Sequence, residues 1–201
     1  MRLGELSYVR LKGKGVLRIV LRLAVVGLAL FFLFPWLSQA KEIRLNSIGV
    51  RGGVSGSSPI GEKESEYFQE YDVIAHWSLP WGRYSESGWG IGTRLMGSAG
   101  GLMAGGDVAF ISTVVPGLVF GKNDGWFSIE AGGGGALLSQ HHFANQNLGG
   151  TFQFVWDLAA RAKVYGGIGA GYWFHHLSDA TLYGDNGRGF DLHMIEVSYR
   201  F

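Results

Sequence analysis

The sequence predicts an all-β protein: an eight-stranded antiparallel transmembrane β-barrel that follows a secretory leader. Three observations predict this fold class. Of the 34 glycines, 30 lie after residue 40, a density that disfavours long helices because each Gly costs about 1 kcal/mol relative to Ala. Apolar and polar residues alternate with a period of two, as in strands. The apolar positions carry bulky aromatic residues and the polar positions carry charges, which is typical of a barrel whose outer face contacts lipid.

Residues 1–40 have the composition of a secretory signal peptide. Six Lys and Arg residues precede an apolar run of twelve residues, Leu23 to Phe34. Ser38 and Ala40 then provide small residues at the −3 and −1 positions of a cleavage site. The apolar run is shorter than the roughly 20 residues of a membrane-spanning helix. We therefore expect export with cleavage after Ala40, with a membrane anchor as the alternative.

The remaining chain, residues 41–201, is expected to form one domain, the barrel. It carries eleven basic and fifteen acidic residues, so it lacks the basic surface that nucleic-acid binding requires. The chain has no Cys, which excludes disulfides and thiolate sites. No pattern in the sequence indicates a metal or another cofactor, and we expect none.

The alternation is clearest over residues 67–79. One face is almost wholly apolar: Tyr67, Gln69, Tyr71, Val73, Ala75, Trp77 and Leu79. The other face is mostly polar: Phe68, Glu70, Asp72, Ile74, His76 and Ser78. A water-soluble barrel would place its apolar face inward, whereas charged residues on the opposite face predict a polar interior and a lipid-facing wall. Closure of such a sheet also satisfies the backbone hydrogen bonds that lipid cannot satisfy.

The same alternation places eight strands along the chain. We expect them near 43–55, 66–79, 88–101, 107–120, 126–139, 149–160, 164–178 and 190–201. Short connections are expected near 121–125 and 161–163, and longer polar loops near 56–65, 140–148 and 179–189. An even number of strands places both ends of the barrel on the short-turn, periplasmic side. A barrel of eight strands is filled by side chains, so any activity is expected on the outer wall, at the rims or in the loops.

Two strands near the end of the chain carry a candidate site. The even face of 164–178 is apolar as far as Phe174 and then continues with His176 and Ser178, which project to the same side because they are two residues apart. If Asp191 lies opposite His176, the same register pairs Gly166 with the terminal Phe201, so the hairpin ends where the chain ends. We therefore expect His176, Ser178 and Asp191 to share one outward-facing patch.

This combination of residues suggests ester hydrolysis. A Ser hydroxyl needs an adjacent base, which His176 can provide, and the Asp191 carboxylate can fix the imidazole tautomer. Loop backbone N–H groups or the Asn186 amide could stabilise the developing oxyanion. A Ser and a His two apart also occur together by chance, but such a cluster on a lipid-facing wall is costly unless it is used. The patch favours hydrolysis of an acyl ester on a membrane lipid.

The same segment resembles the lipid A 3-O-deacylases of the PagL type. The resemblance is carried by His176-Leu177-Ser178-Asp179-Ala180, by the loop Asp185-Asn186-Gly187 and by Asp191. It implies a bacterial outer-membrane serine esterase that modifies lipopolysaccharide by removing the ester-linked acyl chain at position 3 of lipid A. In this role Ser178 is the nucleophile, His176 the base and Asp191 the orienting acid. Lipid A in the outer leaflet is the implied partner, and a homodimer is left open.

Three departures from the family pattern leave other functions open. Asp179 stands where the family usually has Asn, which places a carboxylate at a position associated with the oxyanion. Asp191 stands where some members have Glu, and the loop holds one extra residue near Arg188. The departure at Asp179 most favours the main alternative, a non-catalytic small outer-membrane barrel with a structural or binding role. An acyltransferase that uses the same wall is the third option.

Overall fold

The computed structural model describes residues 42–56, 66–184 and 189–201. The signal peptide expected in residues 1–40 therefore lies outside the described residues. Among the residues that are described, no helix is long and apolar enough to cross a membrane.

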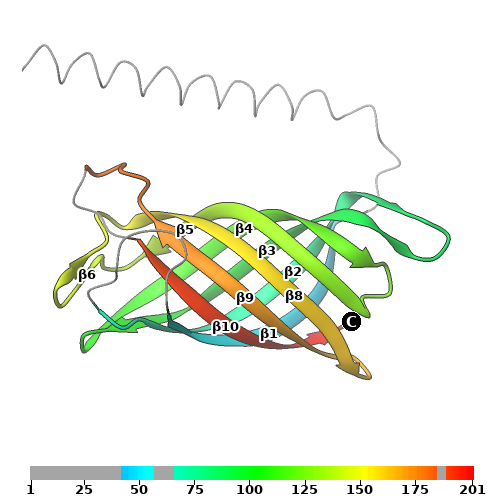
Figure 1. The fold of residues 1–201 in the computed structure, drawn as a ribbon, viewed down its shortest axis with the longest axis horizontal. Helices are drawn as coiled ribbons and strands as arrows, with labels where there is room; N and C mark the ends of the chain where they lie inside the picture. Colours follow the sequence, from blue (N-terminus) through cyan, green and yellow to red (C-terminus); the bar gives the residue numbers. More distant parts are fainter. Residues whose placement is uncertain (1–41, 57–65, 185–188) are drawn as a thin grey trace, which may run out of the picture. The chain divides into compact units, whose positions relative to one another are not determined.

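Eight strands of the described chain close into one antiparallel barrel, in the order β1-β10-β9-β8-β5-β4-β3-β2 (Figure 1). The strands of the barrel are β1 (Arg44–Ser55), β2 (Gln69–Tyr84), β3 (Trp89–Ala104), β4 (Asp107–Lys122), β5 (Phe127–Leu138), β8 (Phe152–Tyr165), β9 (Ile168–Ser178) and β10 (Phe190–Arg200). The remaining two, β6 (His142–Phe143) and β7 (Gln146–Asn147), pair only with each other. The predicted fold class is confirmed.

One predicted connection is wrong. The short turn expected near 161–163 lies instead at residues 166–167, because β8 continues to Tyr165 and β9 begins at Ile168. Gly166 has a φ of 55°, a left-handed conformation that Gly adopts without steric cost. Arg161 remains in the strand because its guanidinium is bound to carboxylates inside the barrel.

The connections differ in length at the two ends of the barrel, as predicted. Residues 85–88, 123–126 and 166–167 join strands at the end where β1 starts and β10 finishes, and the longer connection between β5 and β8 lies at the other end (Figure 1). Of the other two loops that were expected to be long, residues 57–65 and 185–188 lie outside the described residues. The loop expected near 140–148 contains the β6–β7 hairpin. One tight turn also lies at the loop end: Gly105 and Gly106 join β3 to β4 with φ of 57° and 89°, as a two-residue hairpin requires.

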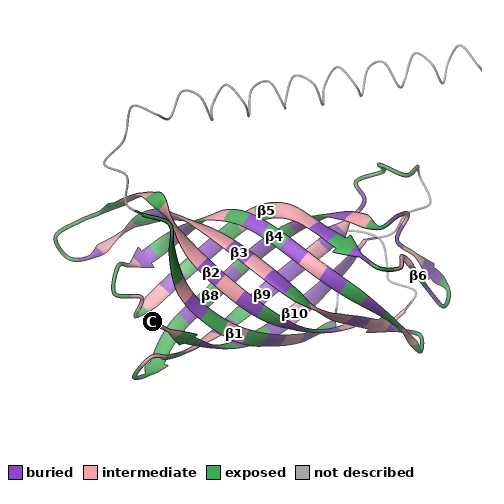
Figure 2. Cartoon of the chain, turned by 180° about the vertical axis from the view of Figure 1, so that it is seen from behind, coloured by how far each residue is buried: buried purple, intermediate pink, exposed green. Residues whose placement is uncertain are grey.

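Buried and exposed residues alternate along the barrel strands (Figure 2). The outward positions expose large apolar side chains around the wall, including Val50, Tyr71, Phe110, Leu118, Ile129, Leu158, Ile195 and Val197. A soluble protein would bury these side chains, whereas lipid accepts them.

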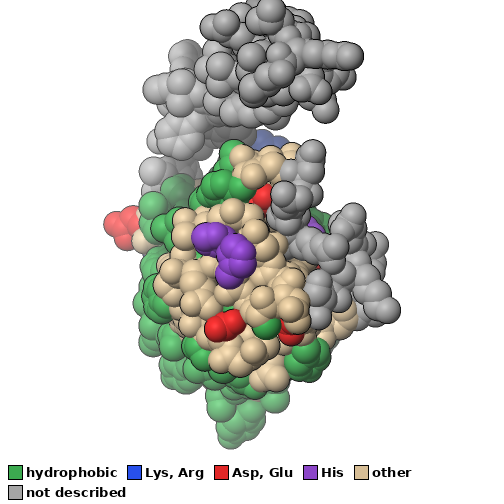
Figure 3. Space-filling view, turned by 90° about the vertical axis from the view of Figure 1, so that its left-hand side faces the viewer, with side chains coloured by type: hydrophobic (Ala, Val, Ile, Leu, Met, Phe, Trp, Pro, Cys, Tyr) green, Lys and Arg blue, Asp and Glu red, His purple; other side chains and the backbone are tan. Residues whose placement is uncertain are grey.

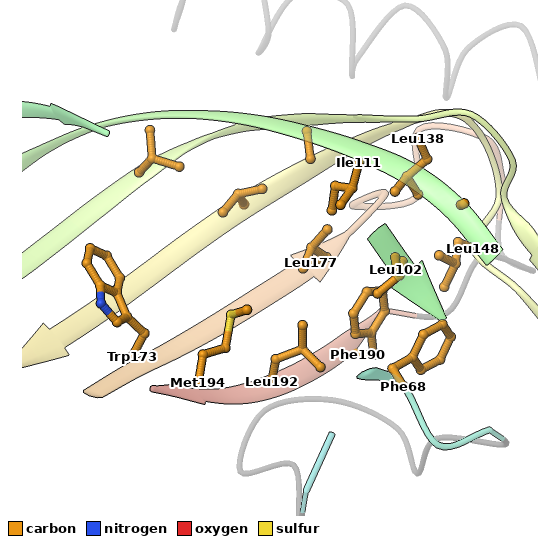
Figure 4. Packing of buried hydrophobic residues seen from close by; sticks show 14 of the residues in the cluster. Phe68, Leu102, Ile111, Leu138, Leu148, Trp173, Leu177, Phe190, Leu192 and Met194 are labelled. Carbon is orange, nitrogen blue, oxygen red and sulfur yellow. The ribbon is translucent and has the colours of Figure 1, made fainter. Parts of the chain in front are cut away.

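The interior is less uniformly polar than the alternation predicted. Toward the loop end it is filled by an apolar cluster, part of which Figure 4 shows. Phe68 stacks on Phe190 with ring centroids 4.2 Å apart, and Phe143 of the β6–β7 hairpin packs edge-on against Phe68 at 5.4 Å. This cluster lies directly behind the candidate site, because Phe190 and Leu177 are cross-strand partners beside it.

Ionic pairs occupy the rest of the interior. Arg51 Nη2 donates to Asp72 Oδ2 at 2.6 Å. Arg161 donates to Glu130 Oε1 at 3.1 Å and to Glu196 Oε1 at 2.8 Å. Trp173 connects the two regions, because its ring belongs to the apolar cluster while its Nε1 donates to Glu196 Oε2 at 2.7 Å.

Replacing Arg161 with Met is expected to destabilise the barrel by about 3–5 kcal/mol, because removal of one partner leaves buried charge uncompensated. The two carboxylates concerned are Glu130 and Glu196, which are 7% and 0% exposed. Urea unfolding in detergent, followed by the mobility shift between folded and unfolded barrel, measures the change. Lys163→Met, at the exposed end of the same strand, is the matched control and should leave the midpoint unchanged.

Candidate active site

The end of β9 and the start of β10 bring the predicted site residues together. Asp191 is the cross-strand partner of His176, and the same register continues to the pair Tyr199–Ile168. The register predicted from the alternation is therefore confirmed. His176 and Ser178 lie on the outward face of β9, whereas Leu177 between them and His175 before them point inward and are fully buried.

His176 and Asp191 form a hydrogen-bonded pair. The Nδ1 atom of His176 is bonded to the Oδ1 atom of Asp191. Asp191 is fully buried, and the side chain of His176 is 19% exposed. A carboxylate at Nδ1 favours the tautomer with its proton on that nitrogen, which leaves Nε2 as the atom that can accept a proton.

Ser178 is the last residue of β9, two residues beyond His176 and closer to the loops. It is partly exposed, and its cross-strand partner on β8 is Phe154. On its other side Gly189 packs closely: a Cβ atom added at Gly189 would lie 2.9 Å from Ser178 Cβ and 2.5 Å from the Leu177 carbonyl oxygen. The backbone that returns to β10 therefore fixes the position of Ser178.

Replacing Gly189 with Ala is expected to displace Ser178 and to lower kcat about 10²-fold, the loss that a misplacement of about 1 Å can produce. The barrel should still close, because Gly189 precedes the first residue of β10. Steady-state kinetics in detergent measure the effect. Gly101→Ala is the control, because an added Cβ meets nothing within 4 Å there. Equal activity of the two variants would show that Gly189 does not position Ser178.

Asp179 takes part in the turn that follows Ser178. Its side chain is buried, at 3% exposed, and its Oδ1 accepts the backbone N–H of Thr181 at 3.1 Å. Ala180 and Thr181 have φ of 48° and 62°, a left-handed conformation that is strained for non-Gly residues. Because an ionised carboxylate can only accept hydrogen bonds, this geometry gives Asp179 the role of stabilising the turn. Asn186, the other predicted oxyanion residue, lies outside the described residues.

Aromatic side chains on the outer wall lie beside the candidate site. Trp156 is the β8 partner of His176, and its ring meets that of Phe174 edge-on, with centroids 5.9 Å apart and an interplanar angle of 70°. Phe154 and Trp156 are 44% and 41% exposed, so they offer an apolar surface to the chains of a bound lipid.

The sequence interpretation missed two features of this site. Gly189 was not singled out, since nothing in its surrounding residues indicates contact with Ser178. A hydrogen bond between Tyr172 and His193 was also missed, although alternation places both residues on the outer wall. His141 and His142 lie in or next to the β6–β7 hairpin at the loop end, and Figure 3 shows exposed histidine side chains at this end of the barrel.

The barrel is closed and its outer wall is apolar. On that wall a Ser lies beside a His that is bound to a buried carboxylate. Together these features are those of a small outer-membrane enzyme. The family model described as Lipid A 3-O-deacylase (PagL) matches residues 69–200, and the chain therefore belongs to the lipid A 3-O-deacylase (PagL) family. The protein is an outer-membrane hydrolase that removes the 3-O-linked acyl chain of lipid A. The family match favours this activity over the non-catalytic barrel.

One of two similar solved structures supports the fold. A structure described as the crystal structure of the outer membrane enzyme PagL superposes with a TM-score of 0.61 at 20% sequence identity, and covers 77% of this chain and 99% of that one. The outer membrane protein Ail of Yersinia pestis, in a phospholipid bilayer nanodisc, gives a TM-score of 0.45 at 9% identity, with 79% of this chain and 100% of that chain covered. No curated protein matches the sequence.

Proposed function

We propose that the protein hydrolyses the 3-O ester of lipid A with Ser178 as nucleophile, His176 as general base and Asp191 as the acid that orients the imidazole. The observation that carries this proposal is the hydrogen bond between His176 Nδ1 and a fully buried Asp191, on the face that also carries Ser178. A buried carboxylate bound to one ring nitrogen prepares the other nitrogen for proton transfer.

The reaction proceeds in two halves. His176 Nε2 takes the proton of Ser178 Oγ as that oxygen bonds to the ester carbonyl carbon, and the carbonyl π electrons move to the oxygen. The tetrahedral intermediate then expels the sugar oxygen at position 3, which receives the proton from His176. In the second half His176 takes a proton from water, the resulting hydroxide attacks the acyl-serine, and the fatty acid leaves as Ser178 regains its proton. The Asp191 carboxylate stabilises the imidazolium in both halves.

The oxyanion needs donors aimed at the carbonyl oxygen. Backbone N–H groups of the turn after Ser178 lie next to the nucleophile in the chain, and the Asn186 amide stays the predicted side-chain donor. Asp179 supports this arrangement indirectly, because its Oδ1 holds the N–H of Thr181 in the strained turn. The role of Asp179 is therefore to position backbone rather than to contact the oxyanion.

The substrate reaches the site from the side, within the membrane. Ser178 lies on the outward face at the loop end of the barrel, and the exposed rings of Phe154 and Trp156 flank it. Acyl chains in the outer leaflet can lie against these rings while the ester remains at the rim. The homodimer left open by the sequence stays a prediction.

Covalent labelling tests the assignment of the nucleophile. An alkyl phosphonate ester that reacts with activated serines is expected to form one adduct on the purified barrel, mapped to Ser178 by mass spectrometry of peptides. His176→Ala should prevent the adduct by removing the base, whereas Ser87→Ala, in an exposed turn at the opposite end, should retain it. An active enzyme that is labelled elsewhere, or not at all, would contradict the mechanism.

A further inference from the structure

A second polar pair lies on the lipid-facing wall, separate from the catalytic residues. The hydroxyl of Tyr172 and the Nδ1 atom of His193 are 2.5 Å apart. Both residues point outward, because His193 is the partner of Phe174 and Tyr172 is the partner of Ile195 in the β9–β10 register. Tyr172 is 45% exposed and His193 is partly exposed. A polar pair at such a position is costly unless it serves a purpose.

The imidazole of His193 is held in one orientation. Its ring stacks on that of Tyr172 and meets the ring of Phe174 edge-on, with centroid distances of 6.1 and 5.7 Å. Its opposite edge lies over Gly56: a Cβ atom there would be 2.6 Å from His193 Cδ2 and 3.0 Å from Nε2. Nδ1 therefore faces Tyr172, and Nε2 faces Gly56 at the start of a loop.

This pair keeps a hydrogen-bond donor unused. A neutral imidazole and a phenol carry two polar protons between them, and the bond between them uses one. The other proton remains either on His193 Nε2 or on the Tyr172 hydroxyl, and a protonated imidazole would leave more. In the described part of the chain, neither side chain makes a second hydrogen bond. A donor left unpaired in an apolar surrounding costs free energy, so an acceptor from outside the protein would be favourable.

The register locates this donor relative to the catalytic patch. Ser55 pairs with Leu192, so continuing the same pairing places Gly56 beside Asp191, which itself pairs with His176. Two strand spacings, about 10 Å, therefore separate His176 from the edge of the His193 ring that lies over Gly56. If the carbonyl being cleaved is held at Ser178, a neighbouring chain of the same lipid can present an acceptor at this lateral distance.

We propose that Tyr172 and His193 bind a carbonyl or hydroxyl oxygen at the head of a second acyl chain of the substrate, while the scissile ester lies at Ser178. This inference rests on the proposed active site and adds a substrate requirement to it. The enzyme is then selective for lipids that carry several acyl chains, because only these present a second oxygen beside the first.

The test compares a multi-acylated and a single-chain substrate. For the purified barrel in detergent, kcat/KM is measured on lipid A and on p-nitrophenyl decanoate, and the ratio of the two is the readout. His193→Phe and Tyr172→Phe are each expected to lower this ratio about tenfold, the usual effect of losing one hydrogen bond, mainly through a higher KM for lipid A. Gly56→Ala should also lower this ratio, because it keeps both polar groups but displaces the imidazole ring of His193.

Tyr199→Phe is the matched control, since Tyr199 is an outward Tyr near the other end of β10, and its ratio should equal that of the wild type. A ratio that His193→Phe leaves unchanged would overturn the proposal. A second arm does not require catalysis: in the Ser178→Ala background, native mass spectrometry measures the fraction of barrel that carries lipid A, and adding His193→Phe should lower its affinity about tenfold. Equal affinity also overturns the proposal, whereas a wild type that cleaves neither substrate contradicts the proposed active site.

Discussion

Replacement of Ser178 by Ala is expected to leave lipid A fully acylated at position 3, with the rate of deacylation lowered on the order of 10⁶-fold. The loss is large because the hydroxyl oxygen forms a bond in the proposed mechanism, so no neighbouring group can replace it. The barrel should remain closed, since no side-chain hydrogen bond of Ser178 contributes to the described part of the fold and Ala is tolerated at the end of a strand.

Mass spectrometry of lipid A from cells that express each variant measures this effect. The wild type should show the mass decrease that corresponds to one acyl chain, and Ser87→Ala should match it. Heat-modifiable mobility in gels establishes that the Ser178→Ala barrel is folded. Deacylation by folded Ser178→Ala at the rate of the wild type would exclude Ser178 as the nucleophile.

The alternation of the sequence predicted the barrel and the register of its last hairpin. A period of two fixes which residues share a face, so the apolar stripe that ends at Phe174 already placed His176 and Ser178 on the outer wall. Pairing Asp191 with His176 also aligned the end of the hairpin with the end of the chain, and this pairing is the observed one. These features depend only on local geometry, which the sequence expresses directly.

The interior was harder to predict because it depends on contacts between strands that are distant in sequence. The inward face of 67–79 carries Glu70 and Asp72, and this favoured a polar interior throughout. Yet the same face also carries Phe68, which stacks on Phe190 more than a hundred residues later. No local pattern shows that these two rings meet, so the division into an apolar loop end and an ionic remainder appears only in the folded barrel.

The contacts around Ser178 could not be predicted from the sequence either. Gly189 follows a segment outside the described residues, and only the closure of the loop brings it against Ser178. The alternation ends at Ser178, so it could not show that Asp179 turns back to bind the N–H of Thr181. The departure at Asp179 places a carboxylate at a position that the family pattern associates with the oxyanion, whereas in the fold this carboxylate accepts the N–H of Thr181.

Replacement of Asp191 by Asn tests the hydrogen-bonded pair that carries the proposed mechanism. The Asp191 carboxylate accepts a hydrogen bond from His176 Nδ1–H, whereas an Asn amide can present its NH₂ group to that nitrogen and favour the opposite tautomer. His176 Nε2 would then hold the proton and could not act as a base. Loss of this function from a Ser–His–acid triad lowers kcat about 10⁴-fold, even when the geometry is intact.

Asp191→Glu separates this electrostatic role from packing. It keeps the carboxylate and adds one methylene at a site that is fully buried, so it should lose stability while retaining activity within about tenfold of the wild type, because a carboxylate remains to orient His176. Rates for both variants are measured on lipid A in detergent, after gel mobility has shown equal folding. If Asp191→Asn were as active as Asp191→Glu, the carboxylate would be structural, and His176 would have to be oriented by other contacts.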